Sequence, residues 1–281
     1  MVPVAQLVER SPVERVCVGS IPIRHPMTLL QSLLLGIVEG ITEFLPISST
    51  GHLVLISGLL GLLQTEFQKS FEITIQLGAI ASVVLLYWRS FLDIRIIKKL
   101  IVGFIPTGII GLALYKIIKT YFIGNEHVVL WSFFLGGLAL IIFEFFHHEP
   151  QDAKDTLQSI SYPHAIVIGL FQSIAIIPGV SRSAATIVGG LLLGLKRKTI
   201  VEFSFLLAVP TMLAATGFDL LQNASSFSPD QFGSLAIGFV ASFAVAAASI
   251  TFLLRFIRNH NFVPFGIYRI LAAIVFWLVV L

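Results

Sequence analysis

The chain has 281 residues, of which 56% are hydrophobic and only 12% are charged. Soluble domains carry roughly 25% charged residues. A mean hydropathy of +0.94 therefore excludes an ordinary soluble fold and predicts an integral membrane protein. The formal net charge of +3 comes mostly from cations in short loops between apolar segments. Because this distribution is typical of membrane topology signals, we expect no nucleic-acid partner.

Residues 1–26 differ from the rest of the chain. They include four prolines and several charged residues, and they lack the apolar stretch of about 7–15 residues that a signal peptide requires. We expect this segment to be a non-native or disordered N-terminal extension, with Met27 as the natural start. The remaining residues, 27–281, are predicted to form one integral membrane domain.

Six apolar segments are long enough to span a membrane as helices, which takes about 17–25 residues. They lie near 71–88, 100–118, 128–146, 200–221, 232–257 and 262–281. Two further apolar regions, 29–63 and 163–195, are interrupted by the polar stretches LPISSTGH at 45–52 and IPGVSRSAAT at 177–186. Proline breaks a helix, and each flanking half is too short to span. We therefore predict two re-entrant helix–loop–helix hairpins, whose loops must be surrounded by protein or water.

The two interrupted regions resemble each other. Residues 36–39 (GIVE) align with 169–172 (GLFQ), and 48–50 (SST) align with 181–183 (SRS) at the same offset. Three spans separate the hairpins, so the second hairpin enters the membrane from the opposite side. The sequence predicts an all-α polytopic membrane protein with an inverted-topology repeat, over about 27–146 and 163–281, in which broken helices meet near the midplane.

Cations in the loops predict the orientation. One side is expected to hold Arg89, Arg95, Lys98, Lys99, Lys154, Lys196, Arg197, Lys198, Arg255 and Arg258, and the other only Lys69, Lys116 and Lys119. The side rich in Lys and Arg is predicted to face the cytoplasm. The first hairpin then enters the membrane from the outside.

The first motif, residues 39–52, contains two acids in an apolar setting. Glu39 and Glu43 are four residues apart and share one face of a helix. Their repulsion could be relieved by a proton, a cation or a nearby arginine. The pair suits a hard divalent cation bound through oxygen or proton transfer, and the alternative is an acid pair at the membrane interface. Ionisable groups inside a membrane are functional by default.

Hydroxyl groups follow the acids. Ser48, Ser49 and Thr50 form one turn with Gly51, which allows close approach of backbone or substrate, so the turn could bind an anion. A hydroxyl nucleophile needs a base, and His52 could act as acid or base near neutral pH. The alternatives are a simple helix cap and a structural histidine.

The second motif, residues 177–186, supplies a fixed positive charge at Arg182. A planar guanidinium suits bidentate binding of phosphate. With the hydroxyls of Ser181, Ser183 and Thr186, it is predicted to hold a phosphoryl group facing the first motif. The alternative is that Arg182 only neutralises the acids.

Other polar residues lie in the spanning segments. Glu72, Gln76 and Glu202 are expected to border the site. Arg269, in the last span, is predicted either to face lipid headgroups or to pair with a buried acid, and the sequence does not choose between the two.

The motifs EGITEFLPISSTGH and PGVSRSAAT resemble the undecaprenyl-diphosphate phosphatases, the bacitracin-resistance family. The resemblance extends from about Met27 to the C-terminus, with Ala184 where many relatives have glycine. It implies hydrolysis of undecaprenyl diphosphate to the monophosphate and phosphate, which recycles the lipid carrier for peptidoglycan synthesis. It also implies a divalent cation (Mg or Ca), frequently a homodimer, and a bacterial inner-membrane location with the site open to the outer face.

The resemblance further implies roles for individual residues. Glu39 and Glu43 match the acidic motif, Ser49 the proposed nucleophile, His52 the motif histidine and Arg182 the phosphate-binding arginine. The sequence does not decide whether Ser49 forms a phosphoserine or only orients the attacking water. The supporting positions are Ser48, Thr50, Ser181, Ser183 and Thr186. A lipid-phosphate flippase or ion-coupled transporter is the alternative, because transporters share this architecture.

Overall fold

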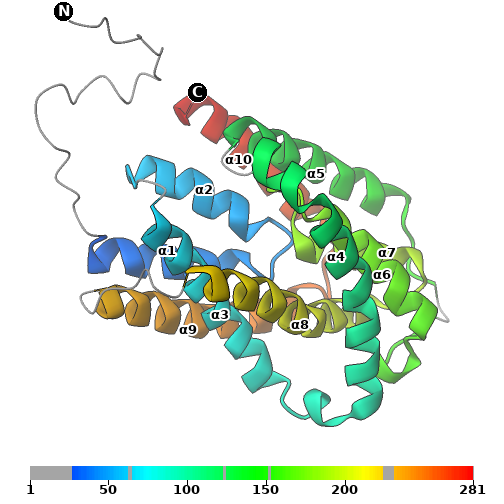
Figure 1. The fold of residues 1–281 in the computed structure, drawn as a ribbon. Coiled ribbons are helices and arrows are strands. Elements are labelled where there is room, and N and C mark those ends of the chain that lie inside the picture. Colours follow the sequence, from blue (N-terminus) through cyan, green and yellow to red (C-terminus); the bar gives the residue numbers. More distant parts are fainter. Residues whose placement is uncertain (1–26, 63–64, 123–124, 151–152, 224–230, 281) are drawn as a thin grey trace, which may run out of the picture.

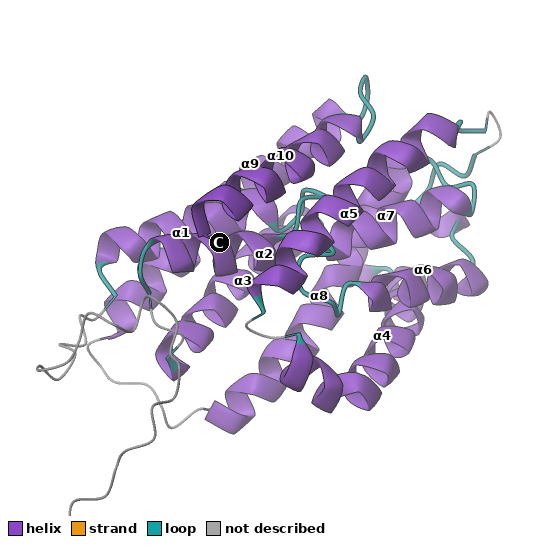
Figure 2. Ribbon diagram, turned by 90° about the horizontal axis from the view of Figure 1, so that it is seen from above, coloured by secondary structure: helices purple, strands orange, loops and turns teal. Residues whose placement is uncertain are grey.

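The computed structural model describes residues 27–62, 65–122, 125–150, 153–223 and 231–280, so the predicted extension of residues 1–26 lies outside it (Figure 1). The described chain is all-helical (Figure 2). Its α-helices are α1 (Leu29–Thr42), α2 (Ser49–Leu59), α3 (Glu66–Leu86), α4 (Ile94–Tyr121), α5 (Glu126–Phe146), α6 (Tyr162–Ile174), α7 (Arg182–Leu192), α8 (Arg197–Asn223), α9 (Phe232–Phe256) and α10 (Val263–Val280). Two short 3-10 segments are η2 (Ser90–Leu92) and η3 (Leu157–Ser159).

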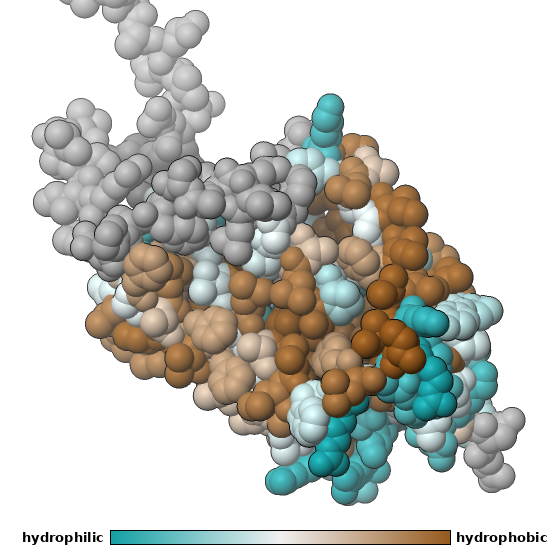
Figure 3. Space-filling view, turned by 60° about the horizontal axis from the view of Figure 1, so that its bottom comes forward, coloured by the Kyte–Doolittle hydropathy of each residue, from teal (hydrophilic) through white to brown (hydrophobic). Residues whose placement is uncertain are grey.

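Five of the described helices are long and apolar enough to cross a membrane. The stretches are Phe67–Leu86, Ile94–Ile118, Glu126–Phe146, Arg197–Gly217 and Phe232–Phe256, and α10 is a shorter apolar helix. Hydrophobic side chains cover most of the described part of the face shown in Figure 3, and hydrophilic ones gather at its lower end. Since soluble monomers rarely expose such large apolar patches, the prediction of a multi-pass membrane protein is confirmed.

Some helices begin before the apolar runs that predict them. Thr65 accepts a hydrogen bond from the backbone N–H of Gln68, so α3 includes a polar first turn. Asp93 accepts one from the N–H of Arg95, so α4 starts in a basic turn. N-cap side chains satisfy the first backbone donors of a helix. Here they fix the first residues of α3 and α4, which hydropathy alone placed several residues too late.

Each interrupted region forms two short helices joined by a loop. We call residues 43–48, between α1 and α2, the first loop, and residues 175–181, between α6 and α7, the second loop. Ser48 and Ser181 end these loops with φ of 70° and 79°, and each is the N-cap residue of the following helix, where only the Ser181 side chain accepts a capping hydrogen bond. A non-glycine residue with positive φ is uncommon and such strain clusters at functional sites. The two aligned serines therefore share one special backbone conformation.

The first helix of each pair packs on a helix from the other half of the sequence. α1 lies along α9, as Figure 1 shows, and α6 packs on α4. A Cβ atom at Gly36 would lie 2.5 Å from the carbonyl oxygen of Gly238, and one at Gly169 would lie 2.0 Å from that of Gly103. Small residues allow helices to approach this closely within a membrane. The aligned glycines thus allow α1 to pack closely on α9 and α6 to pack closely on α4.

Candidate functional site

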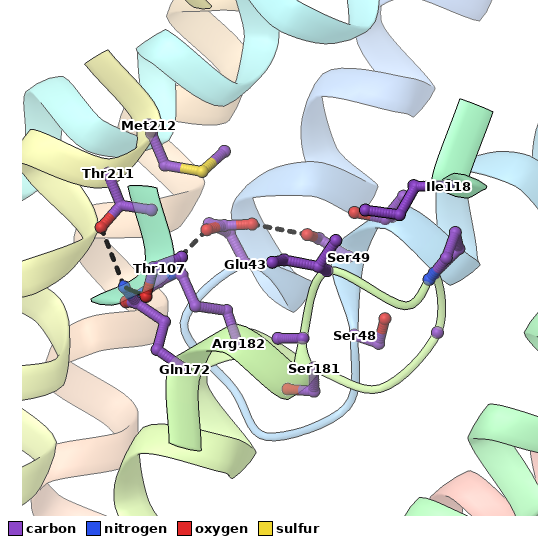
Figure 4. A pocket seen from close by; sticks show the side chains of 15 residues that line it. Glu43, Ser48, Ser49, Thr107, Ile118, Gln172, Ser181, Arg182, Thr211 and Met212 are labelled. Carbon is purple, nitrogen blue, oxygen red and sulfur yellow. Dashed lines mark hydrogen bonds and ion pairs between the residues drawn. The ribbon is translucent and has the colours of Figure 1, made fainter. Parts of the chain in front are cut away.

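The two loops meet at a cavity of about 310 Å³ (Figure 4). Both motifs contribute to its wall, and α4 and α8 complete it. The lining residues are Glu43, Ser48, Ser49, Thr50, Thr107, Ile118, Gln172, Ala175, Ile176, Pro178, Gly179, Ser181, Arg182, Thr211 and Met212. The cavity therefore combines a polar end, where the loops meet, with apolar side chains from α4, α8 and the second loop.

The carboxylate of Glu43 joins the two motifs. Ser49 Oγ donates a hydrogen bond of 2.5 Å to Glu43 Oε2, and Arg182 Nη2 donates one of 3.0 Å to Glu43 Oε1. Both members of the Arg182–Glu43 ion pair are almost buried, with side-chain exposures of 12% and 6%. A base in direct contact with a hydroxyl is the arrangement that activates a nucleophile. A fixed cation beside it can hold a phosphoryl group.

Glu39 lies one turn before Glu43, is fully buried and, unlike Glu43, does not line the cavity. Neither of its carboxylate oxygens has a hydrogen-bond partner among the described residues, and the charges acting on it include those of Glu43, Glu72 and Arg182. An unpartnered carboxylate beside a second one fits a hard divalent cation. Within the described chain no three His, Cys, Asp or Glu side chains gather as metal ligands. Magnesium commonly uses one or two carboxylates plus substrate phosphates, so the two glutamates fit a cation shared with a substrate.

His52 does not line the cavity. Its Nδ1 lies 2.7 Å from the carbonyl oxygen of Ser48, and its Nε2 lies 2.7 Å from Tyr268 Oη on α10. Because a carbonyl can only accept, Nδ1 carries a proton, and in the neutral imidazole Nε2 then accepts from the Tyr268 hydroxyl. His52 therefore braces the first loop against α10, and its acid–base role stays a prediction. Sequence reasoning missed Tyr268, since its partner lies 216 positions away.

The supporting hydroxyls divide into two groups. Those that line the cavity belong to Ser48, Thr50 and Ser181. Ser183 Oγ instead donates to the carbonyl oxygen of Leu45 at 2.8 Å, and Thr186 Oγ1 lies 2.6 Å from Ser204 Oγ. These two buried hydroxyls tie α7 to the first loop and to α8. Their contact with a substrate stays a prediction.

Gly51 is required by packing. A Cβ atom there would lie 2.0 Å from the ring of Phe133, so α2 can approach α5 only with glycine at this position. The residues expected at the border of the site, Glu72, Gln76 and Glu202, do not line the cavity. The charge of Glu72 nevertheless acts on Glu39. Gln68 Nε2 donates to Glu72 at 3.0 Å, and Glu202 lies beside Lys198.

Arg269 is the largest fully buried side chain among the described residues, and both environments predicted for it are wrong. It neither reaches the surface nor forms any ion pair found in the described chain. Its guanidinium donates to the backbone carbonyls of Pro46, Ser132, Phe133, Gly179 and Val180. Because these carbonyls belong to both loops and to α5, Arg269 holds the two loops together.

Sequence reasoning also missed three polar cavity residues outside the loops. Thr107 on α4, Gln172 on α6 and Thr211 on α8 line its wall. The available signal was the internal repeat, which aligns Gln172 with Glu39. The threonines offered no comparable pattern, because each lies in a long apolar helix.

Known proteins resemble this chain over most of its length. The family model for the bacitracin resistance protein BacA matches residues 32–275. An undecaprenyl-diphosphatase of Sulfurihydrogenibium sp. is 53% identical over 252 residues, covering 90% of this chain and 99% of its own. One from Persephonella marina is 52% identical over 91% of this chain and 100% of its own, and one from Aquifex aeolicus is 51% identical over 89% and 98%. The chain therefore belongs to the bacitracin resistance protein BacA family.

Proposed function

We propose that this protein hydrolyses undecaprenyl diphosphate to undecaprenyl phosphate and inorganic phosphate. The relatives with this activity in their name match along nearly the whole chain. The observation that carries the proposal is the Glu43 carboxylate, which contacts both Ser49 and Arg182 in one cavity. Apolar lining from Ile118 and Met212 suits the start of a prenyl tail. The reaction recycles the lipid carrier for peptidoglycan synthesis and confers resistance to bacitracin.

In the mechanism that this geometry supports, Glu43 takes the proton of Ser49 as Oγ attacks the terminal phosphorus. The phosphoanhydride bond breaks, and undecaprenyl phosphate leaves with the bridging oxygen. Water then hydrolyses the phosphoserine and releases phosphate. Arg182 stabilises the charge on the transferred group, since positioning and electrostatics provide most of phosphoryl-transfer catalysis.

A divalent cation, Mg²⁺ or Ca²⁺, is part of the proposal. Glu39 and Glu43 would hold it, and it would neutralise charge on the diphosphate oxygens. We expect EDTA to abolish phosphate release and added cation to restore it. Glu39→Gln should raise the cation concentration needed for half-maximal rate by about tenfold, because it removes one anionic ligand. Thermal unfolding measured across a cation titration gives a second readout. A cation dependence unchanged in Glu39→Gln would show that this residue is not a ligand.

We further propose six transmembrane helices, α3, α4, α5, α8, α9 and α10, with α1–α2 and α6–α7 as re-entrant hairpins of an inverted repeat. The shared conformation of Ser48 and Ser181 and the reciprocal packing of α1 on α9 and α6 on α4 support this arrangement. The loop cations support an inner-membrane orientation with the site open to the outer face. The family resemblance supports a homodimer.

Replacement of Ser49 by alanine tests the activity. Purified protein in detergent is incubated with a prenyl diphosphate and a divalent cation, and phosphate is measured. We expect Ser49→Ala to lower kcat by roughly 10³-fold or more, because it removes the nucleophile. Ser249→Ala is the matched control, since the hydrogen bond that the Ser249 hydroxyl makes within the described chain stays in its own helix, to the carbonyl oxygen of Val245.

Near-normal turnover by Ser49→Ala would exclude the phosphoserine. Phosphate release by the wild-type protein in detergent cannot come from transport, because no compartments exist there. An inactive wild-type protein that unfolds cooperatively would instead favour a flippase or ion-coupled transporter.

A further inference from the structure

Tyr268 on α10 contacts the ring of His52, and the mechanism above uses neither residue. The Tyr268 hydroxyl lies 2.7 Å from His52 Nε2, and the two rings stack with centroids 5.6 Å apart. The ring of Phe133 on α5 also packs on His52, with 5.0 Å between the centroids. Only 3% of His52 is exposed, so α10 and α5 together fix its ring.

The other ring nitrogen of His52 holds the carbonyl group that precedes the nucleophile. Nδ1 lies 2.7 Å from the carbonyl oxygen of Ser48, and the backbone N–H of His52 donates to the same oxygen at 3.3 Å. That carbonyl belongs to the planar peptide group that joins Ser48 to Ser49. Two hydrogen bonds from His52 therefore orient the peptide group from which Ser49 extends. The Ser49 hydroxyl in turn donates to Glu43 Oε2 at 2.5 Å.

The internal repeat indicates why the first loop needs this contact. Ser48 and Ser181 are aligned and share a positive φ. The Ser181 side chain accepts a capping hydrogen bond from the N–H of Ala184 at 3.2 Å, whereas the Ser48 side chain forms no such bond. At the same offset His52 aligns with Ala185, whose side chain cannot donate. A residue keeps an uncommon backbone conformation only where its surroundings impose it. The second loop thus relies on a cap at this point, and the first loop relies on His52.

The tautomer of His52 decides whether the contact with Ser48 can form. In the neutral imidazole one ring nitrogen donates and the other accepts. With the proton on Nε2, the lone pair of Nδ1 would face the Ser48 carbonyl oxygen from 2.7 Å away. The hydrogen bond at one ring nitrogen determines which tautomer is present. By donating to Nε2, the Tyr268 hydroxyl therefore favours the tautomer that Ser48 requires.

We propose that Tyr268 is a positioning residue for the nucleophile, because its hydroxyl keeps His52 in the tautomer that orients the peptide group between Ser48 and Ser49. The role rests on the proposed function, since it affects turnover only if Ser49 reacts. Tyr268 does not line the cavity, so its effect reaches the substrate through His52 and Ser48. The neighbouring Arg269 donates to carbonyls of both loops, whereas Tyr268 acts on the single turn that leads into α2.

Replacement of Tyr268 by phenylalanine removes the hydroxyl and keeps the stacked ring. Purified full-length protein in detergent is given a prenyl diphosphate and a divalent cation, and kcat and KM of phosphate release are measured. We expect kcat to fall about tenfold, because a misplaced nucleophile loses its in-line geometry. KM should stay within about twofold, because Arg182 and the rest of the cavity lining are unchanged.

Tyr162→Phe is the matched control, and its kcat should equal that of wild type. Tyr162 is exposed at the start of α6, and the described chain shows no hydrogen bond to its hydroxyl. Thermal unfolding of each variant in detergent gives the folded fraction to which kcat is referred. A purely structural role for Tyr268 would lower the unfolding temperature and leave kcat of the folded protein unchanged.

A double-mutant cycle tests whether Tyr268 acts through His52. Tyr268→Phe is measured alone, in a His52→Ala background and in a His52→Asn background. Both backgrounds remove Nε2, so the added Tyr268→Phe should lower kcat no further in either. Asparagine places an amide N–H₂ group near the position of Nδ1 and can still donate to Ser48. We therefore expect His52→Asn to have a higher kcat than His52→Ala, and if His52→Ala does not fold, the asparagine background completes the cycle.

A Tyr268→Phe protein with wild-type kcat would overturn the proposal, as would substitutions at positions 268 and 52 whose effects on kcat multiply. Equal inactivity of His52→Asn and His52→Ala would also overturn it, because His52 would then be needed for proton transfer and not for its contact with Ser48. Phosphate release by the wild-type protein in the same assay reports separately on the proposed function.

Discussion

Replacement of Arg182 by alanine is expected to lower phosphate release by about 10³-fold or more, as removal of a transition-state arginine does in other phosphoryl transfers. Arg182 carries the fixed positive charge of the cavity and also holds Glu43 Oε1 at 3.0 Å. The variant loses both the phosphate contact and the orientation of the base. Arg182→Lys should recover only part of the rate, because an ammonium group lacks the planar fork that binds two oxygens. kcat and KM of phosphate release in detergent measure the effect.

Arg95→Ala is the control for this experiment. Arg95 is an exposed arginine at the start of α4, paired only with Asp93 in the described chain. Its loss should leave turnover unchanged. If Arg182→Ala retained wild-type kcat/KM in folded protein, Arg182 would be an ion-pair partner of Glu43 only, and the phosphate contact would have to be assigned elsewhere.

Replacement of Arg269 by methionine is expected to lower the free energy of unfolding by roughly 3–5 kcal/mol. The variant leaves backbone carbonyls of both loops buried without a donor, and it also loses the hydrogen bonds that join them to α5. The same loss should reduce turnover of the folded fraction, since the loops that directly precede Ser49 and Arg182 are no longer held together by Arg269. Thermal unfolding in detergent and phosphate release together measure these effects.

Arg269→Lys separates charge from geometry. Lysine keeps the cation but cannot reach five carbonyls, so we expect stability between wild type and Arg269→Met. Arg255→Met is the control, because Arg255 is exposed at the end of α9. An Arg269→Met protein that unfolds at the wild-type temperature would mean that the loops are held together by other contacts.

The sequence by itself determined the helical membrane class and the position of each break. Hydrophobic length and proline are local properties, so apolar runs located the spanning helices and the interruptions located both loops. The sequence also predicted a functional site at Glu43, Ser49 and Arg182, because polar and ionisable residues are rare within apolar segments. Helix starts at α3 and α4 were placed late, since a cap side chain extends a helix beyond its apolar run.

Only the tertiary structure decided which polar groups are available to a ligand. A hydrogen-bond partner can lie anywhere along the chain, and the pattern around a residue does not encode it. His52 thus hydrogen-bonds to Tyr268, and the Ser183 hydroxyl donates to a carbonyl of the first loop. Arg269 donates to backbone carbonyls and does not pair with an acid. The chemistry of a side chain in this cavity therefore depends on which of its hydrogen-bond donors and acceptors have no partner within the fold.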